Sequence, residues 1–378
     1  MSIALKTANL RNLQRIWNSV RVKGTPYYEN VLLDFKSSRI SFRGQQTTVK
    51  GDLQYSTDDS QNVPAQMFID GGKFFSLVQL SDEITIDNKG AFHTDSNNRF
   101  SIPSLNEDDI DMADQPYDDW IKVTVPFTEE TRKILSSAIG YIDPTDADSI
   151  WSQAVYIQNG HIITASHYKM LFGEIGSSDE GSFAIPAPLA RILPYLNLDG
   201  DVDFLIRKGA GDSTVIQLQY GDIWLRYYCS NSYETPGDLL SEEFTSSYFH
   251  KNYIDVDLAS LSNTARFLLS YFSDVHLLWA TFAFNTQSET PELKLILKYS
   301  SGKTEYSLPI LECSNAEYFE GEEIMLGIDS IRNDTAVLAG MGVSRFRMRV
   351  DVNASSIMFA DGEGKSKVYL VNTLFEDN

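Results

Sequence analysis

Histidine and cysteine are well suited to metal binding and nucleophilic catalysis, and in this chain they are few and scattered. The five histidines lie far apart: His93, His161, His167, His250 and His276. Cys229 and Cys313 lack the close neighbours of a zinc ligand set. There is no phosphate-binding glycine loop and no dinucleotide fingerprint. The sequence therefore predicts no catalytic residue, no metal ligand and no cofactor of these kinds.

Carboxylates are the one abundant reactive group. With 52 Asp and Glu residues, some must lie close together in any fold, so a hydrolytic carboxylate pair stays open. The densest run, Glu107 to Asp119, could be a calcium loop, but it lacks the glycine and the terminal glutamate of an EF-hand. Because this run has no periodic apolar pattern, we interpret it as an exposed linker. Since no catalytic motif is recognisable, we predict that the protein is not an enzyme.

The net charge of -21 over 378 residues argues against a protein whose whole surface binds nucleic acid. The basic residues are segregated, however, because the first 28 residues contain five Lys or Arg and no acidic residue. This pattern favours one basic surface on an otherwise acidic body. Two cysteines indicate a reducing compartment, and no signal-peptide pattern or membrane-spanning apolar run is present. We therefore expect a soluble, cytoplasmic protein that does not contact a membrane.

The elements that must position any site are predicted by a repeated strand-into-helix unit. It appears at Gly181 to Leu196, at Ala65 to Leu80 and at Gly321 to Leu338, and each copy is followed by a pair of strand candidates. Pro194 falls inside the helix of the first of these stretches, so we expect that helix to be short or kinked.

The repeat predicts an α+β protein of three similar domains, at residues 1–118, 119–247 and 248–378. Each domain is expected to carry two amphipathic helices. The first helix of each domain is predicted at Thr7 to Val20, Thr128 to Ile139 and Leu258 to Phe272.

Basic residues recur off the apolar stripes of these helices and in the N-terminal basic segment. They are Arg11, Arg15, Arg21, Lys23, Lys73, Arg132, Lys133, Arg191, Arg266 and Arg332. Taken singly, each of these residues is better explained as a solvent-exposed side chain of a helix than as a DNA contact. If the helices share one side of the sheets, the whole set would line a surface that holds DNA phosphates without reading sequence.

Four short motifs resemble those of the bacterial-type DNA sliding clamp, the beta subunit of the replicative DNA polymerase. Arg99 to Ile102 resembles the family's Arg-Phe-Ser-Leu edge strand, and Ile163 to Tyr168 resembles its Ala-Thr-Asp-Gly-His-Arg stretch without the Asp and Gly. Phe183 to Ala187 resembles Val-Ile-Val-Pro-Arg, and Thr235-Pro236 resembles Phe-Pro between domains two and three. The resemblance covers the whole chain.

The resemblance implies a closed ring of two chains joined head to tail, with helices lining the hole and sheets outside. It implies that double-stranded DNA passes through the hole, and that a DNA polymerase and a separate clamp loader are partners. The homodimer contact would pair Phe100 and Ile102 with Leu268 and Leu269.

The resemblance also implies a pocket for partner peptides between domains two and three. The matching positions are Ile150, Thr164, His167, Tyr168, Pro236, Leu240, Leu370, Asn372 and Leu374. The family usually ends near Met-Pro-Met-Arg, whereas this chain continues past Asn372 through Phe375. We therefore expect a remodelled pocket, of the kind that a phage-encoded clamp would have.

Our leading hypothesis is a processivity factor that encircles duplex DNA. Two alternatives remain at this stage. One is a clamp-fold interaction protein that does not close a ring, and the other is an acidic three-domain binding protein with no role on DNA.

Overall fold

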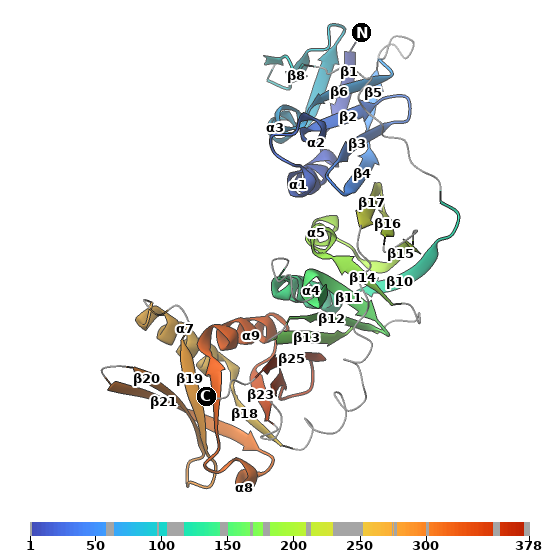
Figure 1. Ribbon diagram of the computed structural model, residues 1–378. Coiled ribbons are helices and arrows are strands. Elements are labelled where there is room, and N and C mark those ends of the chain that lie inside the picture. The colour runs from blue at the N-terminus through green and yellow to red at the C-terminus, as the bar shows by residue number, and fades with distance from the viewer. Residues whose placement is uncertain are drawn as a thin grey trace. The chain divides into compact units, whose positions relative to one another are not determined.

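The computed structural model describes residues 2–57, 64–96, 98–103, 117–143, 150–166, 169–176, 182–208, 213–229, 252–273, 275, 278–299, 302–350 and 356–373. The chain forms two compact units (Figure 1). Unit 1 combines residues 1–127 with 188–232, and unit 2 combines residues 128–187 with 233–378. Each unit is described by itself.

Unit 1 contains two antiparallel sheets. The five-stranded sheet has the order β5-β1-β7-β8-β9, and the eight-stranded sheet has the order β10-β15-β16-β17-β4-β3-β2-β6. The strands of the first sheet are β1 (Ser2–Lys6), β5 (Tyr55–Thr57), β7 (Glu83–Asp87), β8 (Phe92–Thr94) and β9 (Arg99–Phe100). Those of the second are β2 (Asn30–Asp34), β3 (Arg39–Arg43), β4 (Thr47–Asp52), β6 (Gln66–Asp70), β10 (Ile121–Phe127), β15 (Gly200–Lys208), β16 (Thr214–Tyr220) and β17 (Ile223–Cys229).

Unit 2 contains a twelve-stranded sheet in the order β14-β11-β12-β13-β25-β24-β23-β18-β21-β20-β19-β22. Its second-repeat strands are β11 (Ala154–Gln158), β12 (His161–Ala165), β13 (Lys169–Glu174) and β14 (Ser182–Pro186). Its third-repeat strands are β18 (Tyr253–Asp257), β19 (Trp279–Asn285), β20 (Glu292–Tyr299), β21 (Gly302–Cys313), β22 (Glu323–Gly327), β23 (Arg345–Val350), β24 (Ser356–Asp361) and β25 (Val368–Thr373).

The helices pack against these sheets. In Figure 1, α1 lies beside α3, and α7 lies beside α9. The longer helices are α1 (Leu10–Val20), α3 (Gly71–Leu80), α4 (Glu129–Tyr141), α7 (Leu258–Tyr271) and α9 (Ile328–Gly340). The shorter ones are α2 (Pro26–Glu29), α5 (Ala187–Ala190), α8 (Ala316–Phe319) and the 3-10 helices η2 (Ile150–Gln153) and η3 (Leu193–Leu196).

One plan is repeated three times along the chain. A first strand leads into a helix, three further strands follow, another strand leads into a second helix, and three strands end the repeat. The first repeat adds one short strand, β5, which pairs with β1. The pairings repeat as well, since β1·β7, β10·β15 and β18·β23 correspond, as do β2·β6, β11·β14 and β19·β22. The prediction of an α+β fold built from three repeated domains is confirmed, while the exact boundaries of the domains stay a prediction.

The sheets run on from one repeat into the next at two junctions. Within unit 1, β4 of the first repeat pairs with β17 of the second, and within unit 2, β13 of the second pairs with β25 of the third. At each junction a glycine lets a helix pack closely against the sheet: Gly51 in β4 and Gly173 in β13. A Cβ at Gly51 would lie 2.4 Å from the Leu13 side chain of α1, and one at Gly173 would lie 2.6 Å from Ile134 of α4.

The predicted helices are present, with corrected boundaries. The first helix begins at Leu10 rather than Thr7, because Ser2–Lys6 forms a strand and the Thr7 hydroxyl donates to the Ser81 carbonyl oxygen, 2.7 Å away. The helix at Pro194 is short and interrupted, as predicted, since α5 ends at Ala190 and a 3-10 turn follows. Among the described helices, none is long and apolar enough to cross a membrane.

Candidate functional site

Basic side chains are concentrated on the long helices of an otherwise acidic protein. The helices α1, α3, α4, α7 and α9 together contain seven Lys or Arg and four Asp or Glu, a net charge of +3 in a chain of net charge -21. Every one of the ten predicted DNA-binding residues lies in the described part of the chain, and none is buried.

Some of these cations already have partners. Arg11 pairs with Asp82 at 2.6 Å, Lys133 with Glu129 at 3.0 Å, and Arg332 with Asp329 at 3.3 Å.

Arg21 differs because it lies over an aromatic ring. Its guanidinium carbon lies 4.5 Å from the ring centre of Trp17. Four other exposed side chains have no ion pair with any residue that the structure describes, and they are the ones most available to a ligand: Arg15, Lys73, Arg191 and Arg266.

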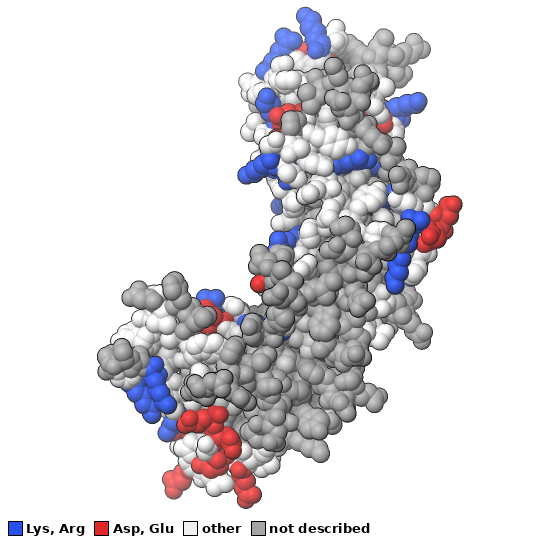
Figure 2. All heavy atoms as spheres, in the orientation of Figure 1, with Lys and Arg blue, Asp and Glu red and all other residues white. Residues whose placement is uncertain are grey.

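The distribution of charge differs between the first and third repeats. On the face in Figure 2, blue side chains are spread over the part that carries the first repeat, whereas the third repeat shows a blue group over β20 and β21 and a red group near α8. Glu317, Glu320 and Glu322 in and beside α8 are exposed. An anionic ligand would therefore be repelled from that end and attracted to the helix faces.

A polar cavity of about 510 Å³ opens between α4 and α9 in unit 2. Hydroxyl, amide and ammonium groups supply its polar wall. Its lining residues are Ser136, Ser137, Gly140, Tyr141, Ser166, Lys169, Asn333, Ala336 and Val337. Lys169 is the one charged residue among them.

A buried carboxylate lies next to this cavity. Asp334 of α9 is fully buried, and it accepts hydrogen bonds from the Tyr141 hydroxyl at the end of α4 and from Nδ2 of Asn372, 2.7 Å away. Burial raises the pKa of Asp334, against smaller opposing effects of Lys169 and of these two hydrogen bonds. Burial, together with the charge of Asp334, raises the pKa of Tyr141 well above its ordinary value.

The predicted partner-peptide pocket is only partly described. Thr164, Leu370 and Asn372 are all buried in the sheet of unit 2, and Thr164 Oγ1 and Asn372 Oδ1 have no hydrogen-bond partner there. Ile150 begins η2. The remaining members lie outside the described residues: His167, Tyr168, Pro236, Leu240 and Leu374. The grouping of these positions into one pocket stays a prediction.

The predicted dimer contact needs one correction. Arg99 and Phe100 do form an edge strand, β9, which is last in its sheet, and Phe100 and Leu269 are half-buried. Leu268, however, is fully buried inside its own unit, so its side chain is not available to another chain. Ile102 is likewise 6% exposed and contributes little apolar surface.

The exposed apolar residues of α7 are the ones that the motif comparison missed. Phe267 is 49% exposed and Tyr271 is 68% exposed, with their rings stacked 5.9 Å apart. Tyr306 of β21 lies edge-on to Phe267, at 5.8 Å. In α3, Leu80 is 70% exposed. The sequence signal for Phe267 was the apolar period of α7. The buried positions Leu261, Ala265 and Leu268 follow the helical period, and Phe267 falls outside it.

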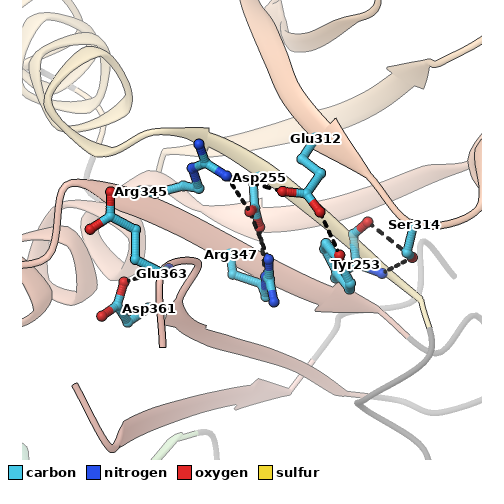
Figure 3. A network of polar contacts seen from close by, with 8 residues as sticks. All are labelled: Tyr253, Asp255, Glu312, Ser314, Arg345, Arg347, Asp361 and Glu363. Carbon is cyan, nitrogen blue, oxygen red and sulfur yellow. Dashed lines mark hydrogen bonds and ion pairs between the residues drawn. The ribbon is translucent and has the colours of Figure 1, made fainter. Parts of the chain in front are cut away.

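A second polar network lies on the sheet of the third repeat (Figure 3). Arg347 binds the fully buried Asp255 through two hydrogen bonds of 2.7 and 2.8 Å, and its guanidinium stacks on Tyr253. Glu312 accepts from the Tyr253 hydroxyl at 2.7 Å and pairs with Arg345 at 3.0 Å. Since each charge here has a partner, we interpret this network as a link between β18, β21 and β23 rather than as a binding site.

Metal binding finds no support among the described residues, where no group of three or more His, Cys, Asp or Glu side chains could hold an ion. The acidic run from Glu107 lies outside the described residues as far as residue 116, so the calcium-loop alternative is not tested.

Comparison with known proteins identifies the fold. No protein-family profile and no curated protein matches the sequence. Solved structures match over the full length of both chains: the beta subunit of DNA polymerase III from Thermotoga maritima (13% identity, TM-score 0.76) and the corresponding subunit from Streptococcus pyogenes (9% identity, TM-score 0.76). A Helicobacter pylori beta clamp bound to a DNA ligase peptide matches at 13% identity with a TM-score of 0.73, again over all of both chains. The chain therefore has the fold of the bacterial DNA polymerase III beta sliding clamps.

Proposed function

We propose that the protein is a non-enzymatic DNA sliding clamp, a homodimeric ring that encircles duplex DNA and tethers a DNA polymerase. One observation carries the proposal. The two strands that keep a free edge at the ends of the three-repeat array, β9 and part of β21, are the counterparts of the strands that join the repeats inside the chain.

The internal junctions give the rule for ring closure. In both, the third strand after the first helix of one repeat pairs with the last strand of the next repeat, as β4 does with β17 and β13 with β25. Applied once more, the rule pairs β21 of the third repeat with β9 of the first repeat of a second chain. In a ring of two chains, both ends of each chain are used and this contact occurs twice.

The two edges are available for this pairing within the described residues. β9 pairs only with β8. Residues Gly302–Pro309 of β21 pair only with β20, whereas Ile310, Glu312 and Cys313 of β21 pair with β18. An unpaired strand edge presents backbone donors and acceptors that another strand can satisfy.

Exposed apolar side chains occur next to these edges. α3 and α9 are corresponding helices with the same burial pattern at their first, fourth, seventh and eighth residues. Leu80 and Val337 are each the tenth residue of their helix. At the second junction, Val337 lines the cavity together with Tyr141, which is the last residue of α4. Tyr271 likewise ends α7. We infer that Leu80 of one chain and Tyr271 of the other meet across the third junction.

The helix cations supply the attraction for DNA. Long cationic side chains that contact phosphates give affinity without sequence recognition, which suits a protein that must slide. A closed ring supplies persistence through topology, so that each contact can stay weak.

The further partners follow from this function. A separate clamp loader would open the ring, and short partner peptides would bind near Thr164 and Asn372. Peptide binding is supported by the H. pylori beta clamp, whose structure contains a bound DNA ligase peptide. The bacterial cytoplasm, or the host cytoplasm of a phage, is the compartment that we propose. We also keep the domain boundaries at residues 118 and 247 as part of the proposal.

Charge-neutralising variants test the DNA contact. Replacing Arg15, Lys73, Arg191 and Arg266 by Ala should weaken binding to a linear duplex and flatten its salt dependence. Removing the charge that neutralises one phosphate lowers the slope of log K against log salt by about 0.9. The matched control removes four exposed cations of the strands and turns and leaves the same net charge: Lys36, Lys89, Lys208 and Lys298.

Binding affinity measured by fluorescence anisotropy at several salt concentrations distinguishes the two variants. The proposal predicts that only the helix variant loses slope. Equal reductions in both variants would show that the helix faces have no special role, and the DNA contact would then have to be abandoned.

A further inference from the structure

The internal junctions show which residue lies opposite each position of the open strand edges. The hairpins that end in β4, β13 and β21 have an equivalent pair at the turn, with four residues between the two members: Arg43 and Thr48, Ala165 and Met170, Lys298 and Lys303. Two residues beyond its pair, β4 has Lys50, which lies opposite Trp224 of β17. At the same point β13 has Phe172, which lies opposite Tyr369 of β25. The corresponding residue of β21 is Glu305.

The corresponding residue of β9 follows from the strands that pair behind it. The second buried residue of the strand after the second helix is equivalent in the three repeats: Ile86, Phe204 and Met348. Two successive pairings lead from these residues to the last strand of each repeat, where they reach Phe100, Leu225 and Leu370. The residues that precede these three are Arg99, Trp224 and Tyr369. The register therefore places Arg99 of one chain opposite Glu305 of the other.

Side chains at this position touch across both internal junctions. The ammonium nitrogen of Lys50 lies 5.1 Å from the ring centre of Trp224. The ring centres of Phe172 and Tyr369 are 6.0 Å apart. Directly opposed side chains of an antiparallel pair have Cβ atoms about 5 Å apart, so an arginine and a glutamate at this position are within reach of each other.

The faces of the two open strands support the same register. Phe92, the cross-strand neighbour of Phe100, packs against Phe74 of α3 with 6.3 Å between the ring centres. Tyr306 packs against Phe267 of α7 at 5.8 Å. The aromatic positions of both strands thus face helices, and the charged residue next to each faces the other side of the sheet. A register shifted by one residue would bring a charge among the aromatic rings.

Both charges are accessible in the single chain. The Arg99 side chain is 58% exposed, and its Nη2 lies 3.6 Å from Asp87 Oδ2, which is longer than a hydrogen bond. Asp87 is already bound by two backbone amides and by His93. The Glu305 side chain is 45% exposed and pairs with Lys303 of its own strand. Neither contact prevents Arg99 from turning toward a second carboxylate.

We propose that Arg99 and Glu305 form an ion pair between chains, and that this pair selects a second copy of the chain in one fixed register. Opposite charges directly across an antiparallel pair stabilise it, and like charges destabilise it. The inference rests on the proposed function and deepens it, because it names the residues by which the two chains recognise each other. In a ring of two chains the pair occurs twice.

The test exchanges the two charges between chains. Arg99→Glu alone puts like charges at both contacts of its homodimer, and Glu305→Arg alone does the same. A dimer of one variant with the other has opposite charges at both contacts. We expect each variant alone to dimerise about thirtyfold more weakly than the unaltered protein, and the equimolar mixture to regain the unaltered affinity. Sedimentation equilibrium without DNA measures all three.

The matched control makes the same charge changes away from the two edges. Lys36→Glu in the turn after β2 and Glu317→Arg in α8 are both at exposed positions. Each should dimerise as the unaltered protein does, alone and in the mixture. Recovery in the mixture of the edge variants would also show that both are folded.

Three results would overturn the inference. If both edge variants weaken the dimer but their mixture stays weak, the two residues do not lie opposite each other. If neither variant weakens a dimer that the unaltered protein forms, the ring stands and the ion pair does not. If the unaltered protein forms no dimer at any concentration, the proposed ring fails together with the pair.

Discussion

The two junctions within the chain share a backbone plan and differ in their side chains. At the first junction, β4 pairs with β17, and the buried Tyr227 donates its hydroxyl to Gln46 Oε1 at 2.6 Å. At the second, β13 pairs with β25, and the half-buried Tyr141 donates to the carboxylate of the buried Asp334. The two junctions therefore have the same strand pairing, while the polar side-chain contacts that stabilise them differ.

This difference has an energetic consequence. A hydrogen bond to a neutral amide contributes roughly 0.5–1.5 kcal/mol, whereas one to a charged group contributes roughly 1.5–3 kcal/mol. A buried carboxylate that loses a partner also keeps its desolvation cost. The second junction should therefore be the more sensitive of the two to loss of a tyrosine hydroxyl.

The largest expected effect is at the junction between chains, where the comparison predicts a third copy of the same pairing. Replacing Phe267 and Tyr271 by Glu would place two charges in that contact. We expect dimerisation to weaken by roughly 3 kcal/mol or more, because exposed aromatics at the centre of an interface dominate its energy. Sedimentation equilibrium measures the change.

The control for this variant carries the same added charge at two other exposed apolar positions. Ile121 is 54% exposed and Tyr195 is 38% exposed, and neither lies in β9, β21 or their adjoining helices α3 and α7. Their Glu variants should dimerise as the unaltered protein does. Equal weakening in both double variants would remove α7 from the interface.

The next effect sharpens the comparison of the two internal junctions. We expect Tyr141→Phe to cost roughly 1.5–3 kcal/mol of unfolding free energy and Tyr227→Phe roughly 0.5–1.5 kcal/mol. Denaturant titration, followed by probes in each unit, gives the two values. A cost for Tyr227→Phe equal to or above that for Tyr141→Phe would contradict our account of the buried carboxylate.

The smallest effect concerns pH. Because the pKa of Asp334 is raised in the folded protein, that protein binds the proton more tightly than the unfolded chain, whose carboxyl titrates near 3.8. The stabilisation from the protonated carboxyl is complete below that value and is lost as the pH rises through the folded pKa. The unaltered protein should therefore lose stability as the pH rises above 3.8, whereas Asp334→Asn, which does not titrate at this position, should not. The difference in unfolding free energy between the two proteins should change with pH in favour of Asp334→Asn, and a constant difference would contradict the raised pKa.

Local patterns were enough to predict most of the fold. Apolar stripes located all the long helices, because their buried positions follow the helical period, as Leu10, Leu13 and Trp17 do in α1. Strand β1 was missed because it is short and runs directly toward that helix. Strand β21 escaped notice because most of its residues are exposed, so that it lacks the clean alternation of a half-buried strand.

The polar contacts at the junctions could not be predicted, because they join residues far apart in the sequence. Tyr141 and Asp334 are separated by 193 positions. Nothing near Asp334 in the sequence distinguishes it from a solvated helix residue. Leu268 was assigned to the dimer contact from the family resemblance, and no motif of the chain lies in that helix to fix its rotation. An error of one residue exchanges the buried Leu268 for the exposed Phe267.

The most direct test of the ring uses the topology of DNA. The chains are diluted until they dissociate, reassembled in the presence of nicked circular duplex, and passed through a gel-filtration column in high salt, before and after the circle is cut. Our account predicts that the protein, at twice the 42.6 kDa chain mass, stays with the circle and is released once the DNA is linear. Equal retention on circular and linear DNA, or none on either, would contradict a closed ring.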